Sequence, residues 1–348
     1  YSLYQLDEKA KVVFLEKYNN FFHRLIRKFW KILGQCNRKY GWFQKSKKII
    51  KNSYCNRWDM PEIIEVIKKQ KFDAIIGIAS TYSTILSILK PKISHTKTIG
   101  WQHSTYEAYF EMPGRRFYHQ EIILNDLFQN LDVYIVQTKD DKEKIKKHFN
   151  YDVINIANPN AFKTDKHSKL TSKKFLAAGR FSFVKSFDKL IRAFYIFSKK
   201  NKDWNLYIYG DGPEKRKCEE LVKELGLENR VFLPGKTSDM ESQYLDATIY
   251  LMSSLWEGWG MVVTEAMEYG LPVISFDLPS VREIFEEKNC GYIIEQNHLQ
   301  DYADAMLSLA NDPVKISEMS KQAIEQAEKF SVEKIGEQWI KVLESRVR

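Results

Sequence analysis

The chain has 348 residues and is 44% hydrophobic, so it is long enough to bury the cores of two ordinary α/β domains. No stretch approaches the roughly 18 consecutive apolar residues of a membrane-spanning helix, the start has no signal-peptide pattern, and the four cysteines lack metal-ligand or redox spacing. The net charge of +9 arises in residues 1–60, which carry 14 Lys or Arg against four acids and therefore predict an anionic partner, either nucleic acid or a lipid surface.

This basic segment is predicted to contain a strand at 11–15 and an amphipathic helix at 21–33 that ends at Gly34. Apolar side chains fall on one face of the helix and basic side chains on the other. Two interpretations stay open: a surface helix that packs its apolar face on the domain, or a helix that lies in a membrane interface. The residues that would meet the membrane are Arg24, Arg27, Lys28, Phe29, Trp30 and Lys31.

From Met60 onward, strand and helix patterns alternate. Strands are expected at 72–79, 98–101, 133–137 and 153–157, with helices at 62–70 and 140–149. The polar run that follows predicts an interdomain linker. We therefore expect an N-terminal acceptor-binding domain at 1–160 and a linker at 161–172.

The alternation then restarts. Six strands are expected, at 175–178, 206–209, 231–233, 249–252, 272–276 and 292–294, with helices between them and three more helices at the end. Such a pattern predicts an α/β protein with two Rossmann-like, doubly wound parallel sheets that face a cleft. The second domain is placed at 173–330, and residues 331–348 are expected to form a C-terminal helix.

The turn and helix that follow the fourth of these strands carry the most chemical information. Two glycines precede the helix that is predicted to begin near Gly260, and the free N–H groups of a helix start favour anions. Glu257 lies in the turn and Glu265 about one and a half turns into the helix, so both carboxylates can face one polar ligand. An ordinary glycine turn with a helix-start acid remains the alternative at this point.

Three other strand ends in the same half suit a nucleotide. Gly179-Arg180 ends the first strand and Lys185 follows it, and an Arg fork with a Lys point charge suits a diphosphate. The next strand ends in a turn too small to block a ligand, and the third offers an apolar ledge for a base. The residues concerned are Gly210, Asp211, Gly212, Leu233 and Pro234.

The order Gly-Arg-x4-Lys, Gly-Asp-Gly-Pro, Phe-Leu-Pro-Gly and Glu-x7-Glu resembles the retaining glycosyltransferases of family 4, which have the GT-B fold, over about residues 170–345. The resemblance implies that Arg180 and Lys185 hold the donor diphosphate, that Glu257 contacts the donor sugar and that Glu265 contacts the ribose. It also implies that Gly179 and the backbone of residues 258–261 line the donor site: Gly258, Trp259, Gly260 and Met261.

The chain departs from the family pattern at two places, one in each half. Ser186 stands where the family usually has Gly, and we expect this change to be tolerated. No glycine precedes Gly34, so the glycine-rich loop of the family is missing, and we expect that the N-terminal domain lacks its first strand–helix–strand. The ending with Trp339 resembles the family's last helix, which returns to the N-terminal domain.

The segment around His103 resembles the part of the family that lies between donor sugar and acceptor. His103 follows a strand end and is expected to hydrogen-bond the transferring sugar as a catalytic residue, with a structural hydrogen bond as the alternative. Glu107 is expected to fix the His103 ring or to touch the acceptor. Arg115 and Arg116 are candidates for an acceptor phosphate, with a solvated loop as the alternative.

The resemblance as a whole implies transfer of a hexose, as glucose, galactose or an N-acetylated form, from a UDP-sugar to a hydroxyl with retention. We expect the Arg180–Lys185 cations to replace a metal, and no cofactor. The implied setting is capsule, lipopolysaccharide or protein-glycan assembly, with a lipid-linked saccharide acceptor at the inner face of a bacterial cytoplasmic membrane. The alternatives are a GT-B epimerase or phosphorylase, a catalytically silent glycan-binding subunit, and a nucleic-acid-binding protein that uses the basic segment.

Overall fold

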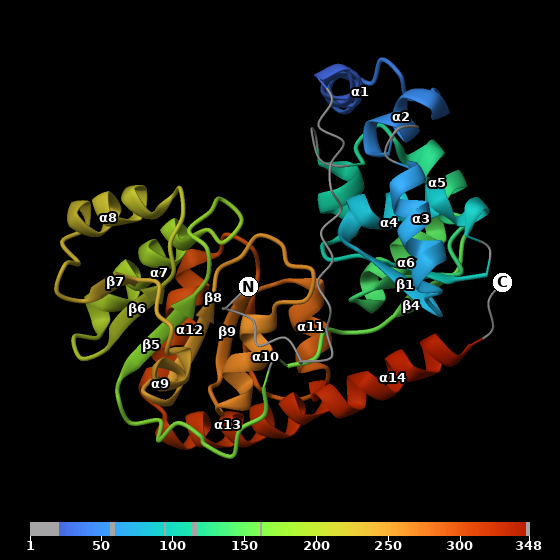
Figure 1. The fold of residues 1–348 in the computed structure, drawn as a ribbon. Coiled ribbons are helices and arrows are strands. Elements are labelled where there is room, and N and C mark those ends of the chain that lie inside the picture. The colour runs from blue at the N-terminus through green and yellow to red at the C-terminus, as the bar shows by residue number, and fades with distance from the viewer. Residues whose placement is uncertain (1–20, 56–59, 94, 113–116, 161, 346–348) are drawn as a thin grey trace.

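The computed structural model describes residues 21–55, 60–93, 95–112, 117–160 and 162–345, with the side chains of residues 21–24, 62, 80 and 122 excepted. The described chain forms two parallel sheets, one in each half, and helices pack against both (Figure 1). The strand predicted at 11–15 lies outside the described residues. The sequence-based expectation of two parallel-sheet, Rossmann-like α/β units is confirmed.

The first sheet has four strands in the order β1-β2-β3-β4, all parallel. Alternate side chains point to opposite faces: Tyr134 and Val136 join one apolar cluster, while Ile99 and Ile135 join another. The strands are β1 (Ala74–Ile78), β2 (Lys97–Trp101), β3 (Val133–Val136) and β4 (Val153–Asn155). Helix α3 (Met60–Gln70) precedes β1, and α4 (Ala79–Leu89), α5 (Glu121–Phe128) and α6 (Lys139–His148) lie between successive strands.

Two basic helices, α1 (Phe21–Tyr40) and α2 (Lys47–Tyr54), pack on each other at the end of this half that lies farthest from the second sheet (Figure 1). The prediction that the first helix ends at Gly34 is wrong. A Cβ at Gly34 would lie 2.6 Å from the Ser53 Cβ, so this glycine serves the close crossing of α2 instead of ending α1. The helix continues for six residues beyond it.

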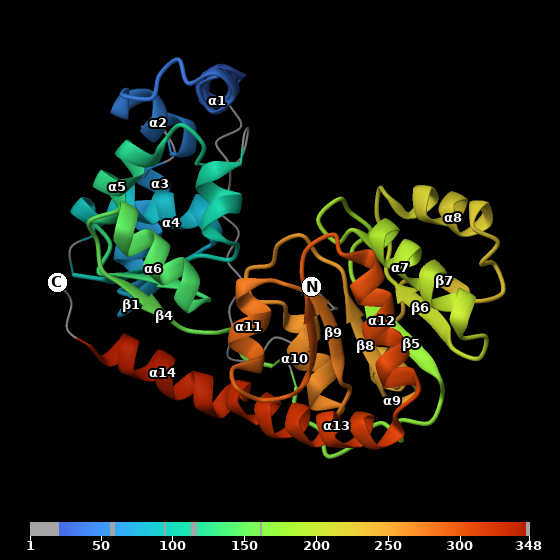
Figure 2. The same cartoon turned by 180° about the vertical axis from the view of Figure 1, so that it is seen from behind.

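The second sheet has six parallel strands in the order β10-β9-β8-β5-β6-β7, so the direction of winding reverses between β5 and β8. Figure 2 shows its helices from behind. The strands are β5 (Lys174–Ala178), β6 (Asn205–Tyr209), β7 (Val231–Gly235), β8 (Ile249–Met252), β9 (Val273–Phe276) and β10 (Gly291–Ile294). The helices are α7 (Phe187–Lys200), α8 (Lys215–Glu224), α9 (Met240–Leu245), α10 (Met261–Glu268), α11 (Pro279–Phe285), α12 (Leu299–Ala310) and α13 (Pro313–Ala327).

The chain passes between the two halves twice. Residues 162–173 contain no helix or strand, and the Asn160 N–H donates to the Phe330 carbonyl (2.7 Å) where the two passages meet. Beyond Phe330, α14 (Val332–Glu344) runs back beneath the first sheet (Figures 1 and 2), where Ile335 and Val342 pack on Ile99 and its neighbours. The buried Lys97 ammonium donates to the carbonyl of Val342 near the end of α14.

Candidate functional site

The carboxyl ends of β5 and β8 hold the two charged side chains that the sequence singled out. These strands are neighbours at the point where the winding reverses, which is where ligands bind in open parallel sheets. Lys185, after β5, and Glu257, after β8, form an ion pair with 2.5 Å between Nζ and Oε1. The Ser254 hydroxyl donates to the same carboxylate oxygen at 2.7 Å. The structure therefore brings both predicted residues to one point.

The two loops are joined directly to each other. The Leu255 N–H donates to the Val184 carbonyl (2.8 Å), and the Ser253 hydroxyl donates to the Lys185 carbonyl (2.8 Å). The side chains of the ion pair are 20% and 16% exposed, so the charges are largely removed from solvent but still open to it. Such partial burial strengthens their electrostatic action on a bound anion.

The second carboxylate lies on α10. Gly260 caps this helix with φ +85°, a left-handed conformation that suits glycine, and the free N–H groups of the first turn follow it. The buried Tyr244 hydroxyl donates to Glu265 at 3.0 Å and fixes one carboxylate oxygen. Burial raises the pKa of Glu265, while the Tyr244 hydrogen bond lowers it. Trp259 is buried in the core, so only its backbone is available to a ligand.

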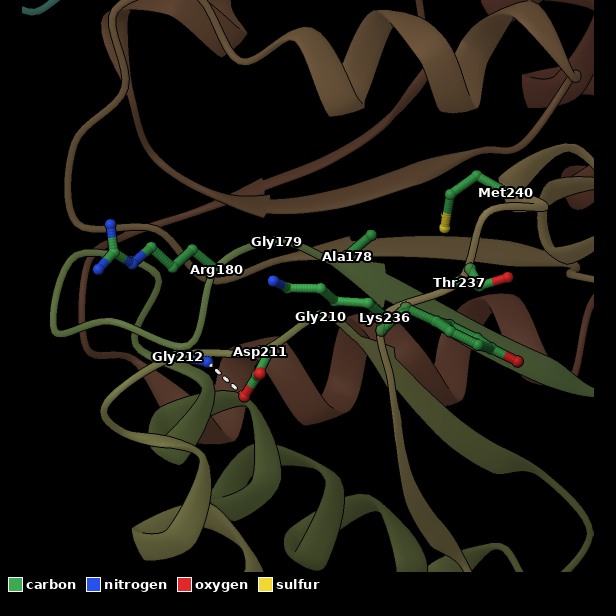
Figure 3. Close-up of a pocket in the computed structure, with 10 residues that line it drawn as sticks. Ala178, Gly179, Arg180, Gly210, Asp211, Gly212, Lys236, Thr237 and Met240 are labelled. Carbon is green, nitrogen blue, oxygen red and sulfur yellow. Dashed lines mark hydrogen bonds between the residues drawn. The ribbon is translucent and has the colours of Figure 1, made fainter. Parts of the chain in front are cut away.

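A cavity of about 600 Å³ opens beside these loops (Figure 3). A side chain on Gly210 would collide with the Gly179 carbonyl, so two strand ends approach each other closely here. The lining includes five residues expected in the donor site: Gly179, Arg180, Gly210, Asp211 and Gly212. The remaining lining residues, which sequence reasoning missed, are Ala178, Tyr209, Lys236, Thr237 and Met240.

Three of the missed residues follow the third strand of this half, β7. Lys236 and Thr237 come after Gly235 at the end of β7, and Met240 begins α9. Their place after a strand end of a parallel sheet is a signal that could have found them. Leu233 and Pro234, expected as the ledge for a base, do not line this cavity. Leu233 packs against the core of the sheet and Pro234 is exposed.

The first sheet contributes His103 to the same place. Gly258 packs so closely on the loop after β2 that a Cβ there would lie 3.0 Å from the His103 carbonyl oxygen. His103 thus lies across the gap from the loop that carries Glu257. Its ring packs on Trp101, with centroids 4.2 Å apart, and burial lowers the pKa of the imidazole and so favours its neutral form.

Glu107 is held by a helix of the same half. It begins a short π-helical turn, Glu107–Glu111, and pairs with Lys144 on α6, which also binds Asp140 at 2.6 Å. The His103 ring is therefore fixed by Trp101 in this structure, and Glu107 is engaged by Lys144. Arg115 and Arg116 lie outside the described residues, as does the Arg24 side chain.

The two halves also touch away from the site. The Glu283 carboxylate on α11 accepts the Lys139 N–H at the start of α6 (2.6 Å). Burial raises the pKa of Glu283, and the Lys139 hydrogen bond opposes this. In the described part of the chain, no group of three His, Cys, Asp or Glu side chains could hold a metal ion. No helix among these residues is long and apolar enough to cross a membrane.

On α1, one face stays open to solvent. Leu25 is 48% exposed, Phe29 55% and Ile32 46%, beside the exposed Lys28 and Lys31. The helix packs on α2 through Gly34 and its neighbours, and Arg27 and Trp30 are half-buried. The interpretation in which α1 packs its apolar face on the domain is therefore wrong for Leu25 and Phe29, whereas Ile26 and Leu33 of the same predicted face are half-buried.

Comparison with known proteins agrees with this geometry. The profile of the family described as "Glycosyl transferases group 1" matches residues 160–330. The chain is 31% identical over 296 residues to an uncharacterized glycosyltransferase of Haemophilus influenzae, covering 80% of this chain and 78% of that protein. The chain therefore belongs to the group 1 glycosyl transferases, and the two facing parallel-sheet domains are those of the GT-B fold.

Two further matches cover a smaller share of the matched protein. A poly(ribitol-phosphate) alpha-N-acetylglucosaminyltransferase of Staphylococcus aureus is 34% identical over 166 residues, which cover 47% of this chain and 33% of that enzyme. A crystal structure of a mutant S. aureus TarM in complex with fondaparinux, alpha-GlcNAc-glycerol and UDP superposes with a TM-score of 0.69 and 26% identity. It covers 82% of this chain and 59% of the TarM chain, so this chain spans only part of either protein.

Proposed function

We propose that this protein transfers a hexose or N-acetylhexosamine from a UDP-sugar to a hydroxyl of a saccharide acceptor, with retention, as in glycosyltransferase family 4. The observation that carries the proposal is the Lys185–Glu257 ion pair, which lies between the cavity after β5–β7 and the half-buried His103 of the facing domain. In this proposal Arg180 and Lys185 stabilise the charge that develops on the leaving diphosphate without a metal. Glu257 and His103 contact the transferring sugar, and Glu265 contacts the ribose.

UDP is proposed as the nucleotide because a relative of 26% identity was crystallised with UDP, and that relative covers most of this chain. The cavity is large enough for a nucleotide and offers both an apolar wall, at Met240, and polar groups, at Lys236 and Thr237. An N-acetylated sugar is favoured because the S. aureus relative is an N-acetylglucosaminyltransferase.

The test is thermal stabilisation of the protein by UDP, GDP and ADP, repeated with Glu265→Ala. UDP is expected to raise Tm, and the variant is expected to lose most of that rise because Glu265 binds the ribose. A 100-fold excess of UDP over its Kd corresponds to about 2.7 kcal/mol of stabilisation. An equal response to all three nucleotides, or an unchanged response in the variant, would contradict the proposed donor site.

The exposed face of α1 supports a second part of the proposal, a peripheral position at the inner face of the cytoplasmic membrane with a lipid-linked acceptor. Leu25, Phe29 and Ile32 present apolar surface, and Lys28 and Lys31 present charge to anionic lipid. In vesicle sedimentation, Lys28→Glu with Lys31→Glu should abolish binding to anionic vesicles. The matched control, Lys199→Glu with Lys200→Glu on α7, should leave it unchanged. Salt-sensitive oligonucleotide binding without vesicle binding would favour a nucleic-acid partner instead.

A further inference from the structure

Two aromatic side chains stand beside the Lys185–Glu257 pair. Phe183 lies in the loop between β5 and α7, and Trp256 lies in the loop after β8, next to Glu257 in the sequence. Their ring centroids are 6.2 Å apart with 55° between the ring planes. Phe183 is 69% exposed, which is among the highest values for a large apolar side chain in the described part of the chain.

The exposure of Phe183 is built into the loop. Phe181 and Phe187, on either side of it, are buried in the core of the domain. Between them, the Lys185 N–H donates to the Ser182 carbonyl (3.0 Å), and the Val184 carbonyl accepts the Leu255 N–H. The backbone on both sides of Phe183 is therefore fixed, and its ring is held toward solvent by the same contacts that position Lys185.

The aromatic pair lies near the transfer point and outside the nucleotide cavity. Neither Phe183 nor Trp256 lines that cavity, whose walls come from the strand ends of β5, β6 and β7. Each ring belongs to a loop that also supplies one member of the Lys185–Glu257 pair, and a backbone hydrogen bond joins the two loops. A saccharide bound on these rings would thus lie close to the place where the new glycosidic bond forms, while the nucleotide occupies the cavity.

The chemistry of such a pair fits a pyranose ring. One face of a pyranose carries C–H groups with a slight positive charge, which an aromatic ring attracts through its negative face, while the sugar hydroxyls stay available to polar partners. The adjacent Glu257 offers such a partner. We propose that Phe183 and Trp256 form an acceptor subsite that binds the apolar face of a pyranose ring in the acceptor saccharide; this inference rests on the proposed function of the same site.

The experiment measures saccharide binding directly, by saturation-transfer NMR of maltose and chitobiose in the presence of saturating UDP. Sorbitol, which has hydroxyls but no ring, is the ligand control. We expect saturation on the C–H protons of one sugar face, and about 5- to 10-fold weaker binding in Phe183→Ala and in Trp256→Ala. Phe183→Tyr and Trp256→Phe keep an aromatic face and should keep the binding. Phe72→Ala, at an exposed phenylalanine of the first domain, should have no effect.

Each alternative result has a definite meaning. Equal binding of sorbitol, or unchanged binding in both alanine variants, would overturn the subsite. If Phe183→Ala instead reduced the thermal stabilisation by a UDP-hexose relative to UDP, the ring would belong to the donor and the acceptor assignment would be wrong. A UDP response with no saccharide binding would overturn the subsite alone. Saccharide binding that depends on Phe183, without any UDP response, would support the subsite while the proposed donor function fails.

Discussion

Lys185 and Glu257 partly neutralise each other across the β5–β8 boundary, because their charged atoms lie 2.5 Å apart. The carboxylate also accepts the Ser254 hydroxyl, so its position is fixed from two sides. An anionic donor that binds here must share the lysine with this carboxylate. A mutation of this pair can therefore change nucleotide affinity and transfer rate in opposite directions.

Glu257→Gln is expected to tighten UDP binding and to slow transfer. The amide keeps the shape of the side chain but removes the negative charge, so the Lys185 ammonium is left free to attract the diphosphate. We expect UDP to bind about 3- to 10-fold more tightly, which corresponds to about 1 kcal/mol. Loss of the sugar contact should lower kcat by roughly 100-fold. Calorimetry with UDP and a transfer assay check the two effects.

Lys185→Met is the matched variant, with the opposite effect on binding. It removes the cation and leaves Glu257 facing the diphosphate, so both UDP affinity and kcat should fall. If Glu257→Gln weakened UDP binding as Lys185→Met does, the carboxylate would be a direct nucleotide ligand, and the neutralisation argument would be wrong.

Trp339→Ala is expected to slow transfer although Trp339 is remote from the cavity. Its indole packs edge-to-face on Trp101 (centroids 4.8 Å apart), and Trp101 in turn packs on His103. Truncation would leave a void behind Trp101 and let His103 shift, and displacements of about 1 Å can cost roughly 100-fold in rate. Kinetic assays should show a lower kcat with an unchanged KM for the donor.

Trp339→Phe should restore most of the rate, because it keeps an aromatic ring against Trp101. Ile340→Ala, at a 52%-exposed neighbour on the same helix, is the control for a general effect on α14. An equal loss of rate in Ile340→Ala would assign the effect to the helix as a whole.

The sequence predicted the second sheet well and the first half less well, for identifiable reasons. Most strands of the second sheet are short β-rich runs that end at a glycine or a small polar residue, so their pattern is local. By contrast, α4 is rich in Ser, Thr and buried apolar residues and has no clear amphipathic period, and it was not predicted. Neither were α2 and α5. The sequence assigned Lys185 and Glu257 to one donor site but did not predict the ion pair between them. The Trp339–Trp101–His103 stack was not predicted either, because it depends on two chain segments over 200 residues apart in the sequence.

Ser186→Gly is expected to stabilise the protein. Ser186 has φ 50° and ψ 42° at the start of α7, a left-handed conformation that costs a residue with a Cβ about 1–2 kcal/mol. Glycine adopts it freely but loses roughly 0.4–1 kcal/mol through the entropy of the unfolded chain. The net gain should be about 0.5–1 kcal/mol, measured by denaturant unfolding. Ser186→Ala keeps the Cβ and should give no gain; equal stabilisation by Ala would contradict the backbone explanation.

Ionisation of the Asp141 carboxyl is expected to lower the free energy of unfolding as pH rises. Its carboxyl is buried, and burial raises its pKa from 3.8 to about 7, although hydrogen bonds from the Tyr106 N–H (2.6 Å) and the Thr138 hydroxyl oppose the shift. The nearby Glu107 and Asp140 raise it further. Because the folded state binds this proton more tightly than the unfolded state does, the contribution is complete below about pH 4 and is lost as pH rises through 7.

The size of the effect follows from the same shift. Some three units of pKa correspond to at most roughly 4 kcal/mol between pH 4 and pH 8. Asp141→Asn is neutral at every pH, so the difference in unfolding free energy between wild type and variant should move in favour of the variant as pH rises from 5 to 8. Urea unfolding at several pH values measures that difference. A difference that is constant across this range would mean that Asp141 is ionised throughout, held by Tyr106 and Thr138 against the cost of burial.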